Sequence, residues 1–161
     1  MRLDPTRLAR GGSSLVDYLE IWREARTSDA LTLLSRIQAR GLDRRVMVVD
    51  CDRSAGFIYR FFGGGLTFVN AAQRATLIGK PTEAFGDPHT VLSARDGYVA
   101  AVESDLPFCE LVDQPRLDFS GAPLPRTPFR RLVLPVPINA RVTRMIVASE
   151  LIRPPASSGR R

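Results

Sequence analysis

The sequence has few of the residues that build metal centres, disulfides and nucleophilic active sites. It contains one histidine, His89, and two cysteines, Cys51 and Cys109, with no CxxC or Cys/His spacing around them. One histidine excludes a two-histidine metal site and leaves at most a single axial haem ligand. A serine or cysteine nucleophile would need that same histidine as its base. We therefore expect no metal site, two buried free thiols and no covalent catalysis.

Long apolar runs are also missing. No stretch approaches the roughly 18 apolar residues that a membrane-spanning helix needs, and the first residues lack the apolar core of a signal peptide. A cytoplasmic location is therefore expected. With 161 residues, the chain has the size of one domain and is too short for a sensor with a separate output domain.

Lysine is almost absent, because 22 of the 23 basic residues are arginine and Lys80 is the exception. The net charge is +6, but the arginines are scattered singly and in the pairs Arg44-Arg45, Arg130-Arg131 and Arg160-Arg161. No continuous basic helix or stripe is visible. This distribution favours a dispersed, solvated basic surface over a dedicated polyanion site, and it argues against a nucleic-acid partner.

The chain begins with a predicted tail, residues 1–12, and ends with another, residues 154–161, around one domain at 13–153. A first helix should start near Ser13-Ser14, and a second should run from Ser28-Asp29 to Gly41. The first is amphipathic and could cover a sheet or pair with a copy of itself. Its apolar face comprises Leu15, Tyr18, Leu19 and Trp22. The second is expected to bury Leu31, Leu34 and Ile37.

The remaining elements alternate between strands and helices. Residues 46–51 and 57–62 predict a hairpin, residues 66–77 and 90–104 predict helices, and residues 107–113, 128–136 and 141–151 predict three closing strands. In the second strand, Phe57, Tyr59 and Phe61 should share one face, with Ile58, Arg60 and Phe62 on the other. This order indicates an α+β fold with an antiparallel sheet and helices on one face.

Several short motifs occur in the order found in PAS-type sensor domains. The run Phe57-x-Tyr59-Arg60-x-x-Gly63 resembles the F-x-Y-R-x-x-G strand of a PAS-like family common in alphaproteobacteria. Further similar pieces are Ile78-Gly79 after a helix, Tyr98 followed by Pro107, and Arg130 to Pro135, which is similar to an R-L-L-L-P strand. The resemblance covers residues 13–152. It implies a five-stranded antiparallel sheet in the order 2-1-5-4-3, with helices over one face and a hollow between them.

That hollow would be either a filled core or a ligand pocket. The side chains expected around it are Tyr59, Phe68, Phe85, Tyr98, Val102, Leu132, Leu134, Met145 and Val147. A pocket would add a few polar groups to apolar walls, and Arg60, Tyr98 and Arg130 are the candidates. Arg60 could bind a ligand carboxylate or phosphate, or it could pair with Asp50 across the hairpin.

Motifs for common cofactors do not fit the sequence. Arg74 stands at the first glycine position of a GxxxxGK phosphate loop and Pro81 at its Ser/Thr position, while Gly63-Gly64-Gly65 lacks the GxGxxG spacing. The same three glycines would interrupt an RRM-like RNA-binding strand. The flavin-adduct cysteine motif of light-sensing PAS domains is not present. No cofactor is required by the sequence, and neither haem nor flavin is supported.

We therefore expect a non-catalytic, cytoplasmic PAS-like module that senses a small molecule or docks a partner signalling protein. The resemblance further predicts a homodimer through the helix at 14–26, with Leu15, Tyr18, Leu19 and Trp22 at its interface. One alternative is a small enzyme acting on a hydrophobic metabolite, with Tyr98 and a carboxylate as acid and base. Another is a weak nucleic-acid-binding protein that uses the dispersed arginines.

Overall fold

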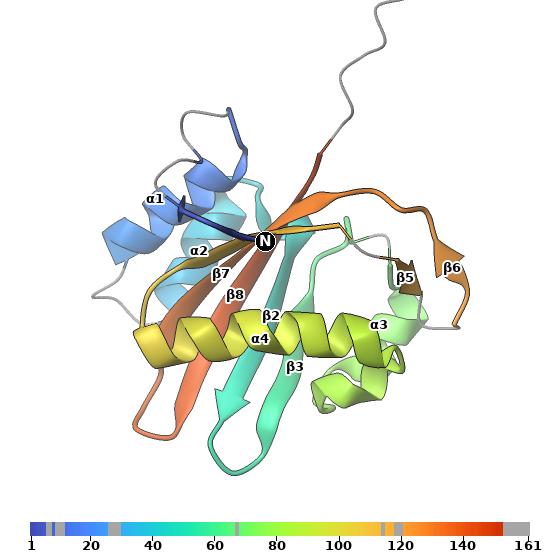
Figure 1. Cartoon of the computed structure of the whole chain (residues 1–161). Helices are drawn as coiled ribbons and strands as arrows, with labels where there is room; N and C mark the ends of the chain where they lie inside the picture. The colour runs from blue at the N-terminus through green and yellow to red at the C-terminus, as the bar shows by residue number, and fades with distance from the viewer. Residues whose placement is uncertain are drawn as a thin grey trace, which may run out of the picture.

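The computed structural model describes residues 1–5, 8, 12–25, 30–66, 68–113, 115–117 and 121–152. Its centre is a six-stranded sheet in the order β1-β4-β7-β8-β2-β3, in which all neighbours are antiparallel (Figure 1). The strands are β1 Arg2–Leu3, β2 Val46–Asp52, β3 Gly56–Phe62, β4 Phe108–Val112, β7 Phe129–Pro137 and β8 Val142–Leu151. The predicted α+β class is confirmed, and the five longer strands follow the order that the resemblance to PAS domains implies.

The helices connect and cover this sheet. They are α1 Leu15–Ala25, α2 Ala30–Ala39, α3 Ala71–Leu77 and α4 Pro88–Ser104, with the 3₁₀ turns η3 Asp43–Arg45 and η4 Thr82–Phe85. Two short strands, β5 Arg116–Leu117 and β6 Pro123–Leu124, pair with each other in the segment between β4 and β7. Side chains define several helix starts: Asn70 forms a capping box with Gln73, and Asp87 accepts from the backbone of His89.

Helices cover both faces of the sheet, so the expectation of helices on one face is wrong. The helices α1 and α2 pack on one face and the helices α3 and α4 on the other (Figure 1). The reason lies in β7. Leu132 and Leu134 belong to the core beneath α1 and α2, and Val133 belongs to the core beneath α3 and α4. A strand with apolar side chains on both sides needs cover on both sides.

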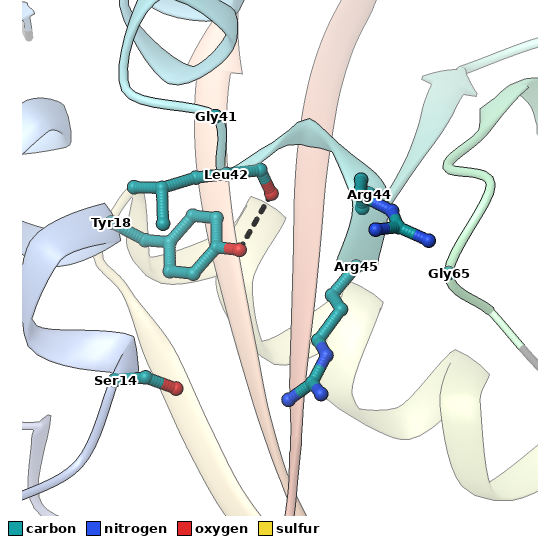
Figure 2. A pocket seen from close by; sticks show the side chains of 7 residues that line it. All are labelled: Ser14, Tyr18, Gly41, Leu42, Arg44, Arg45 and Gly65. Carbon is teal, nitrogen blue, oxygen red and sulfur yellow. Dashed lines mark hydrogen bonds between the residues drawn. The ribbon is translucent and has the colours of Figure 1, made fainter.

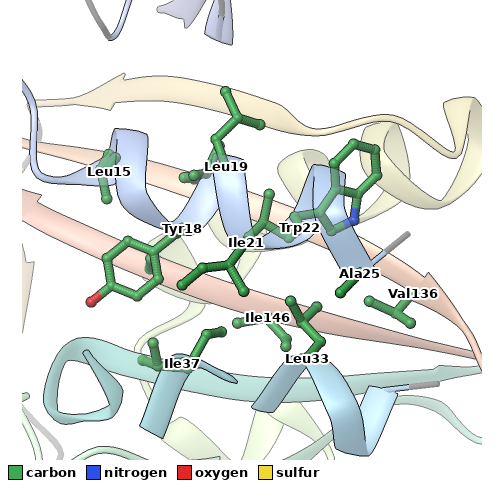
Figure 3. Packing of buried hydrophobic residues seen from close by; sticks show 14 of the residues in the cluster. Leu15, Tyr18, Leu19, Ile21, Trp22, Ala25, Leu33, Ile37, Val136 and Ile146 are labelled. Carbon is green, nitrogen blue, oxygen red and sulfur yellow. The ribbon is translucent and has the colours of Figure 1, made fainter. Parts of the chain in front are cut away.

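The face under α1 and α2 holds a mainly aliphatic core (Figure 3). Leu15, Tyr18, Leu19 and Trp22 are each at most 5% exposed, and the indole of Trp22 donates to the carbonyl of Pro135 at 2.8 Å. The predicted apolar face of the helix is therefore confirmed. Because it packs against the sheet of its own chain, these side chains are not available to a second copy, and a homodimer would need another surface.

The buried side of α2 differs from the predicted one. Leu33 and Ile37 are buried and Leu34 is half-buried, whereas Leu31 is 69% exposed. Successive helical residues are rotated by about 100°, so Leu31 and Leu33 cannot share a face. The helix ends as predicted before Gly41, which has a φ of +67°. The predicted start at residues 28–29 lies outside the described part of the chain.

A β-bulge changes which aromatic residues of β3 share a face. Val48 pairs with Phe61 and Val49 with Tyr59, so Arg60 is the extra residue between them. As a result Phe62 lies with Tyr59 in the core beneath α3 and α4, and Phe61 packs on the opposite face. The strict alternation predicted for this strand is therefore wrong beyond Arg60.

The beginning of the chain also departs from the predicted tail. Arg2 and Leu3 form β1 at the edge of the sheet, opposite Glu110 and Cys109 of β4, and Leu8 is buried. This two-residue strand extends the sheet by one member beyond the five that the sequence predicted. Residues 153–161, which include the predicted C-terminal tail, lie outside the described residues.

Candidate functional site

The region between α3, α4 and the sheet, where the resemblance implies a hollow, is packed with aromatic side chains. Phe85 and Tyr98 are 3% and 1% exposed. Ring centroids lie 5.5 Å apart for Phe57 and Tyr98, and 4.9 Å apart for Tyr59 and Phe62. Such distances are those of favourable aromatic contacts. The geometry is that of a filled core.

The residues predicted to line the hollow separate into two groups. Seven belong to the core beneath α3 and α4: Tyr59, Phe68, Phe85, Tyr98, Val102, Met145 and Val147. Leu132 and Leu134 lie on the opposite face of the sheet, in the core beneath α1 and α2. The sequence placed them with Met145 because the faces of β7 and β8 cannot be told apart when both are apolar.

The buried tyrosines of this core are poorly suited to proton transfer. Burial raises the pKa of Tyr98 to about 12, with a smaller opposing effect from Arg131. Burial also raises the pKa of Tyr59, whose hydroxyl donates to the carbonyl of Thr82. An acid or base is most efficient when its pKa lies near the working pH. These two tyrosines therefore act as packing residues of the core.

Arg60 pairs with Asp50, the structural alternative considered for it. Its Nε donates to Asp50 Oδ2 at 2.8 Å, and Arg144 donates to both oxygens of Asp50 at 2.7 and 2.9 Å. Burial acts to raise the pKa of Asp50, but the hydrogen bonds from Arg144 and Arg60 outweigh it, so the pKa is lowered. Arg60 and Arg144 line a pocket of about 240 Å³ beside α2.

Arg130 is likewise engaged by a carboxylate. Its guanidinium donates to Glu150 at 3.1 Å, and Glu150 also accepts from the hydroxyls of Ser13 and Ser14. The backbone N–H of Ser14, just before α1, donates to the same carboxylate at 2.6 Å. Glu150 thus occupies the position at the start of α1 that favours an anion.

A pocket of about 400 Å³ opens on the side of α1 where the chain enters β2 (Figure 2). We call it the arginine pocket. It is lined by Ser14, Tyr18, Gly41, Leu42, Arg44, Arg45 and Gly65. Figure 2 shows α1 supplying Tyr18 from one side, the segment before β2 supplying the two arginines, and Gly65 facing them from the opposite loop.

Glycines bring the two walls of the arginine pocket together. A Cβ on Gly63 would lie 2.2 Å from the carbonyl oxygen of Asp43, and one on Gly65 would lie 3.0 Å from that of Arg44. The N–H of Gly65 donates to the Arg44 carbonyl at 2.7 Å. Only glycine permits so close a backbone approach at Gly63. The triple glycine therefore anchors η3, a role that its sequence alone did not reveal.

The polar groups of the arginine pocket differ in availability. The hydroxyl of Tyr18 donates to the Leu42 carbonyl at 2.7 Å, and the hydroxyl of Ser14 donates to Glu150. By contrast, the guanidinium groups of Arg44 and Arg45 are exposed and make no hydrogen bond or ion pair with any residue that the structure describes. These two cations are the free donors of the site.

Arg44-Arg45 stands out as a pair in the sequence, but the pattern of arginines there indicates only a dispersed surface charge. A usable signal was present, because the pair directly precedes an apolar strand and so must lie at the rim of the sheet. What the sequence could not show is that Tyr18 and Gly65, far from the pair in the chain, complete a pocket around it. The arginine pocket is therefore a product of tertiary packing.

The remaining reactive residues lie apart from this pocket. His89 is exposed at the start of α4, and its backbone N–H donates to Asp87. Both cysteines are free; Cys109 is buried and Cys51 half-buried, and burial raises the pKa of Cys109 to about 11. Among the described residues no group of three or more His, Cys, Asp or Glu side chains is placed to hold a metal ion. No described helix is both long and apolar enough to span a bilayer.

Comparisons with known proteins gave matches in structure only. No protein-family model and no curated protein matches the chain. A crystal structure of a PAS domain from Colwellia psychrerythraea superposes with a TM-score of 0.49 and 14% identity, over 74% of this chain and 97% of that one. An RNA-binding light-oxygen-voltage receptor superposes with a TM-score of 0.45 and 20% identity, over 74% of this chain and 33% of that one.

Proposed function

We propose that this chain is a non-catalytic PAS-like sensory module that binds a small anionic molecule in the arginine pocket. The observation that supports this is the pair of guanidinium groups, Arg44 and Arg45, which have no ion-pair or hydrogen-bond partner among the described residues and line a pocket of about 400 Å³. Guanidinium groups bind carboxylates and phosphates through paired, charge-assisted hydrogen bonds. Two such groups at one concave surface are suited to a small anion.

Most of the other arginines that the structure describes contrast with this pair, although Arg23 and Arg53 are also exposed and form no ion pair among the described residues. Ion pairs with carboxylates engage Arg36, Arg40, Arg60, Arg95, Arg126, Arg130, Arg131, Arg141 and Arg144. Neutralised arginines contribute little to attraction of a polyanion. We therefore favour a small anion over a nucleic acid.

The enzyme alternative relied on Tyr98, and its burial is the reason we do not prefer it. A side chain that is 1% exposed, with its pKa raised to about 12, offers a substrate neither access nor a suitable proton acceptor. As a sensory module, the protein would pass its signal on through contact with a partner signalling protein. A homodimer, a cytoplasmic location and membership of the alphaproteobacterial PAS-like family stay predictions.

The proposal is tested by NMR titration of the ¹⁵N-labelled protein with inorganic phosphate at constant ionic strength. Saturable shifts are expected for the amides of Ser14, Leu42 and Gly65. They should be lost in the double variant R44Q/R45Q. The matched control, R23Q/R53Q, removes two exposed arginines outside the pocket and should titrate like the natural protein. Absent shifts, or equal shifts in both double variants, would contradict the proposal.

A further inference from the structure

A second, smaller pocket adjoins the arginine pocket. It has a volume of about 150 Å³ and is lined by Arg45, Gly65, Leu66, Phe68, Phe129, Ser149 and Leu151. Arg45 and Gly65 also line the arginine pocket, so the two pockets share these two residues as walls. We call the smaller one the side pocket. Arg45 therefore stands at the boundary between a basic pocket and its neighbour.

The side pocket has a different chemistry from the arginine pocket. Four of its seven lining residues carry large apolar side chains from three separate segments: Leu66 and Phe68 after the glycines, Phe129 at the start of β7, and Leu151 at the end of β8. Phe129 and Leu151 face each other across the β7–β8 pairing. Leu66 is nearly buried, whereas Leu151 is 51% exposed. Apolar surface is thus left in water beside the Arg45 cation, which lines both pockets.

We propose that the ligand is an amphipathic anion, with its carboxylate or phosphate at Arg44 and Arg45 and a short apolar group in the side pocket. This inference rests on the proposed function and adds the class of ligand. An inorganic ion would use the two guanidinium groups and leave the surface around Leu151 hydrated. An apolar group attached to the same anion would remove that surface from water, which favours binding.

The volume of the side pocket limits the apolar group. At about 30 Å³ for a group the size of a water molecule, 150 Å³ accommodates about five such groups. Burial of one methylene contributes about 0.8 kcal/mol, which corresponds to about a fourfold gain in affinity, and an open pocket should give less. We therefore expect a two- to fourfold gain for each added methylene up to about five, and no further gain beyond that length.

Titration calorimetry with sodium acetate, butyrate, hexanoate and decanoate at one ionic strength tests this inference. Affinity should rise from acetate to hexanoate and level off by decanoate. Hexanol, which lacks the charge, should bind far more weakly than hexanoate. The double variant R44Q/R45Q should lose at least tenfold in hexanoate affinity. Affinity that is equal for acetate and hexanoate but still depends on the arginines would overturn this inference and leave the proposed function standing.

A pair of leucine variants locates the apolar group. Leu151→Asn in the side pocket should weaken hexanoate three- to fivefold and leave acetate unchanged. Leu106→Asn is the matched control, because Leu106 is 50% exposed, like Leu151, but does not line the side pocket. Both sites are exposed, so both variants should fold. Equal effects of the two substitutions would overturn the assignment, and failure of every anion to bind would reject the proposed function as well.

Discussion

The two faces of the sheet are built from different side chains, and the difference indicates where a ligand can bind. Beneath α3 and α4 the core is aromatic, with ring contacts such as that between Phe57 and Tyr98. Beneath α1 and α2 it is mainly aliphatic, as Ile21 and Leu33 illustrate. The polar openings lie beside this second core, at the arginine pocket and at the Arg60–Asp50–Arg144 cluster.

Large rings fill the space where the resemblance implies a hollow, so a ligand would have to displace part of the core. On the opposite face a ligand would displace no core side chains, because the helical layer ends near η3, where the chain turns into β2. The proposed function therefore assigns the anion to the side of α1 and α2, whereas the side pocket, lined by Leu66 and Phe68, borders the aromatic core. Three experiments test this difference between the two faces.

The largest effect is expected on the aromatic face. Tyr98→Ala should lower the free energy of unfolding by about 3–5 kcal/mol, because a fully buried ring is replaced by a cavity. Urea denaturation followed by circular dichroism measures this change. Tyr98→Phe, which keeps the ring, should cost much less. If Tyr98→Ala were nearly neutral, the region beneath α4 would not be a packed core and the contrast between the two faces would disappear.

An intermediate effect on stability is expected at Gly63, where the glycine loop packs against η3. Gly63→Ala would place a methyl group 2.2 Å from the Asp43 carbonyl, so the loop or η3 must shift, at a cost of about 1–3 kcal/mol. It should also weaken phosphate binding in the arginine pocket. Gly64→Ala is the control, because a Cβ there would have only ordinary van der Waals contact, 3.7 Å from a side-chain nitrogen of Arg74. Thermal unfolding and the phosphate titration measure both effects. Equal behaviour of the two variants in these measurements would contradict this account.

The smallest effect concerns the ion cluster beside α2. Asp50→Asn should cost about 1–2 kcal/mol at neutral pH, less than the loss of a fully buried pair, because Arg60 is 44% exposed. Asp50 has a lowered pKa in the folded protein, so its contribution is present above its ordinary value of 3.8 and is lost as pH falls through the folded value.

Chemical denaturation at pH values from 7 down to 2 tests this pH dependence. Between about pH 4 and the lower folded pKa, the natural protein should lose more stability than the Asp50→Asn variant, because the variant has no carboxylate there to protonate. Parallel curves of stability against pH for the two proteins would show that the ion pairs of Asp50 with Arg144 and Arg60 contribute no stability. The cluster would then be a surface feature with no part in holding β2, β3 and β8 together.

Local patterns were sufficient to predict most elements. Leu15, Tyr18, Leu19 and Trp22 recur at helical spacing, and all four are buried in α1. The spacing of the strand-like runs predicted the five longer strands and, through the family resemblance, their order. Arg60 pairs with Asp50, one of the two roles that the sequence left open for it, because opposite charges on adjacent strands attract. These features depend on near neighbours in the chain or on one pairing.

The predictions that failed depended on packing between distant segments. Leu132 and Leu134 were assigned to the wrong face because β7 is apolar on both sides. Phe61 and Phe62 exchanged faces because a single bulge reverses the alternation that follows it. Leu31 was expected inside, but the orientation of α2 on the sheet leaves it in solvent.

The sequence by itself determined the succession of helices and strands, the apolar surfaces that each must bury, and the presence of an arginine pair before β2. These follow from residue spacing and from backbone and charge preferences that act locally. Only the tertiary structure decided which face each helix covers, that aromatic rings fill the expected hollow, and that Tyr18 and Gly65 form a pocket around Arg44 and Arg45. Those outcomes depend on how side chains from distant segments share one volume, which residue spacing does not encode.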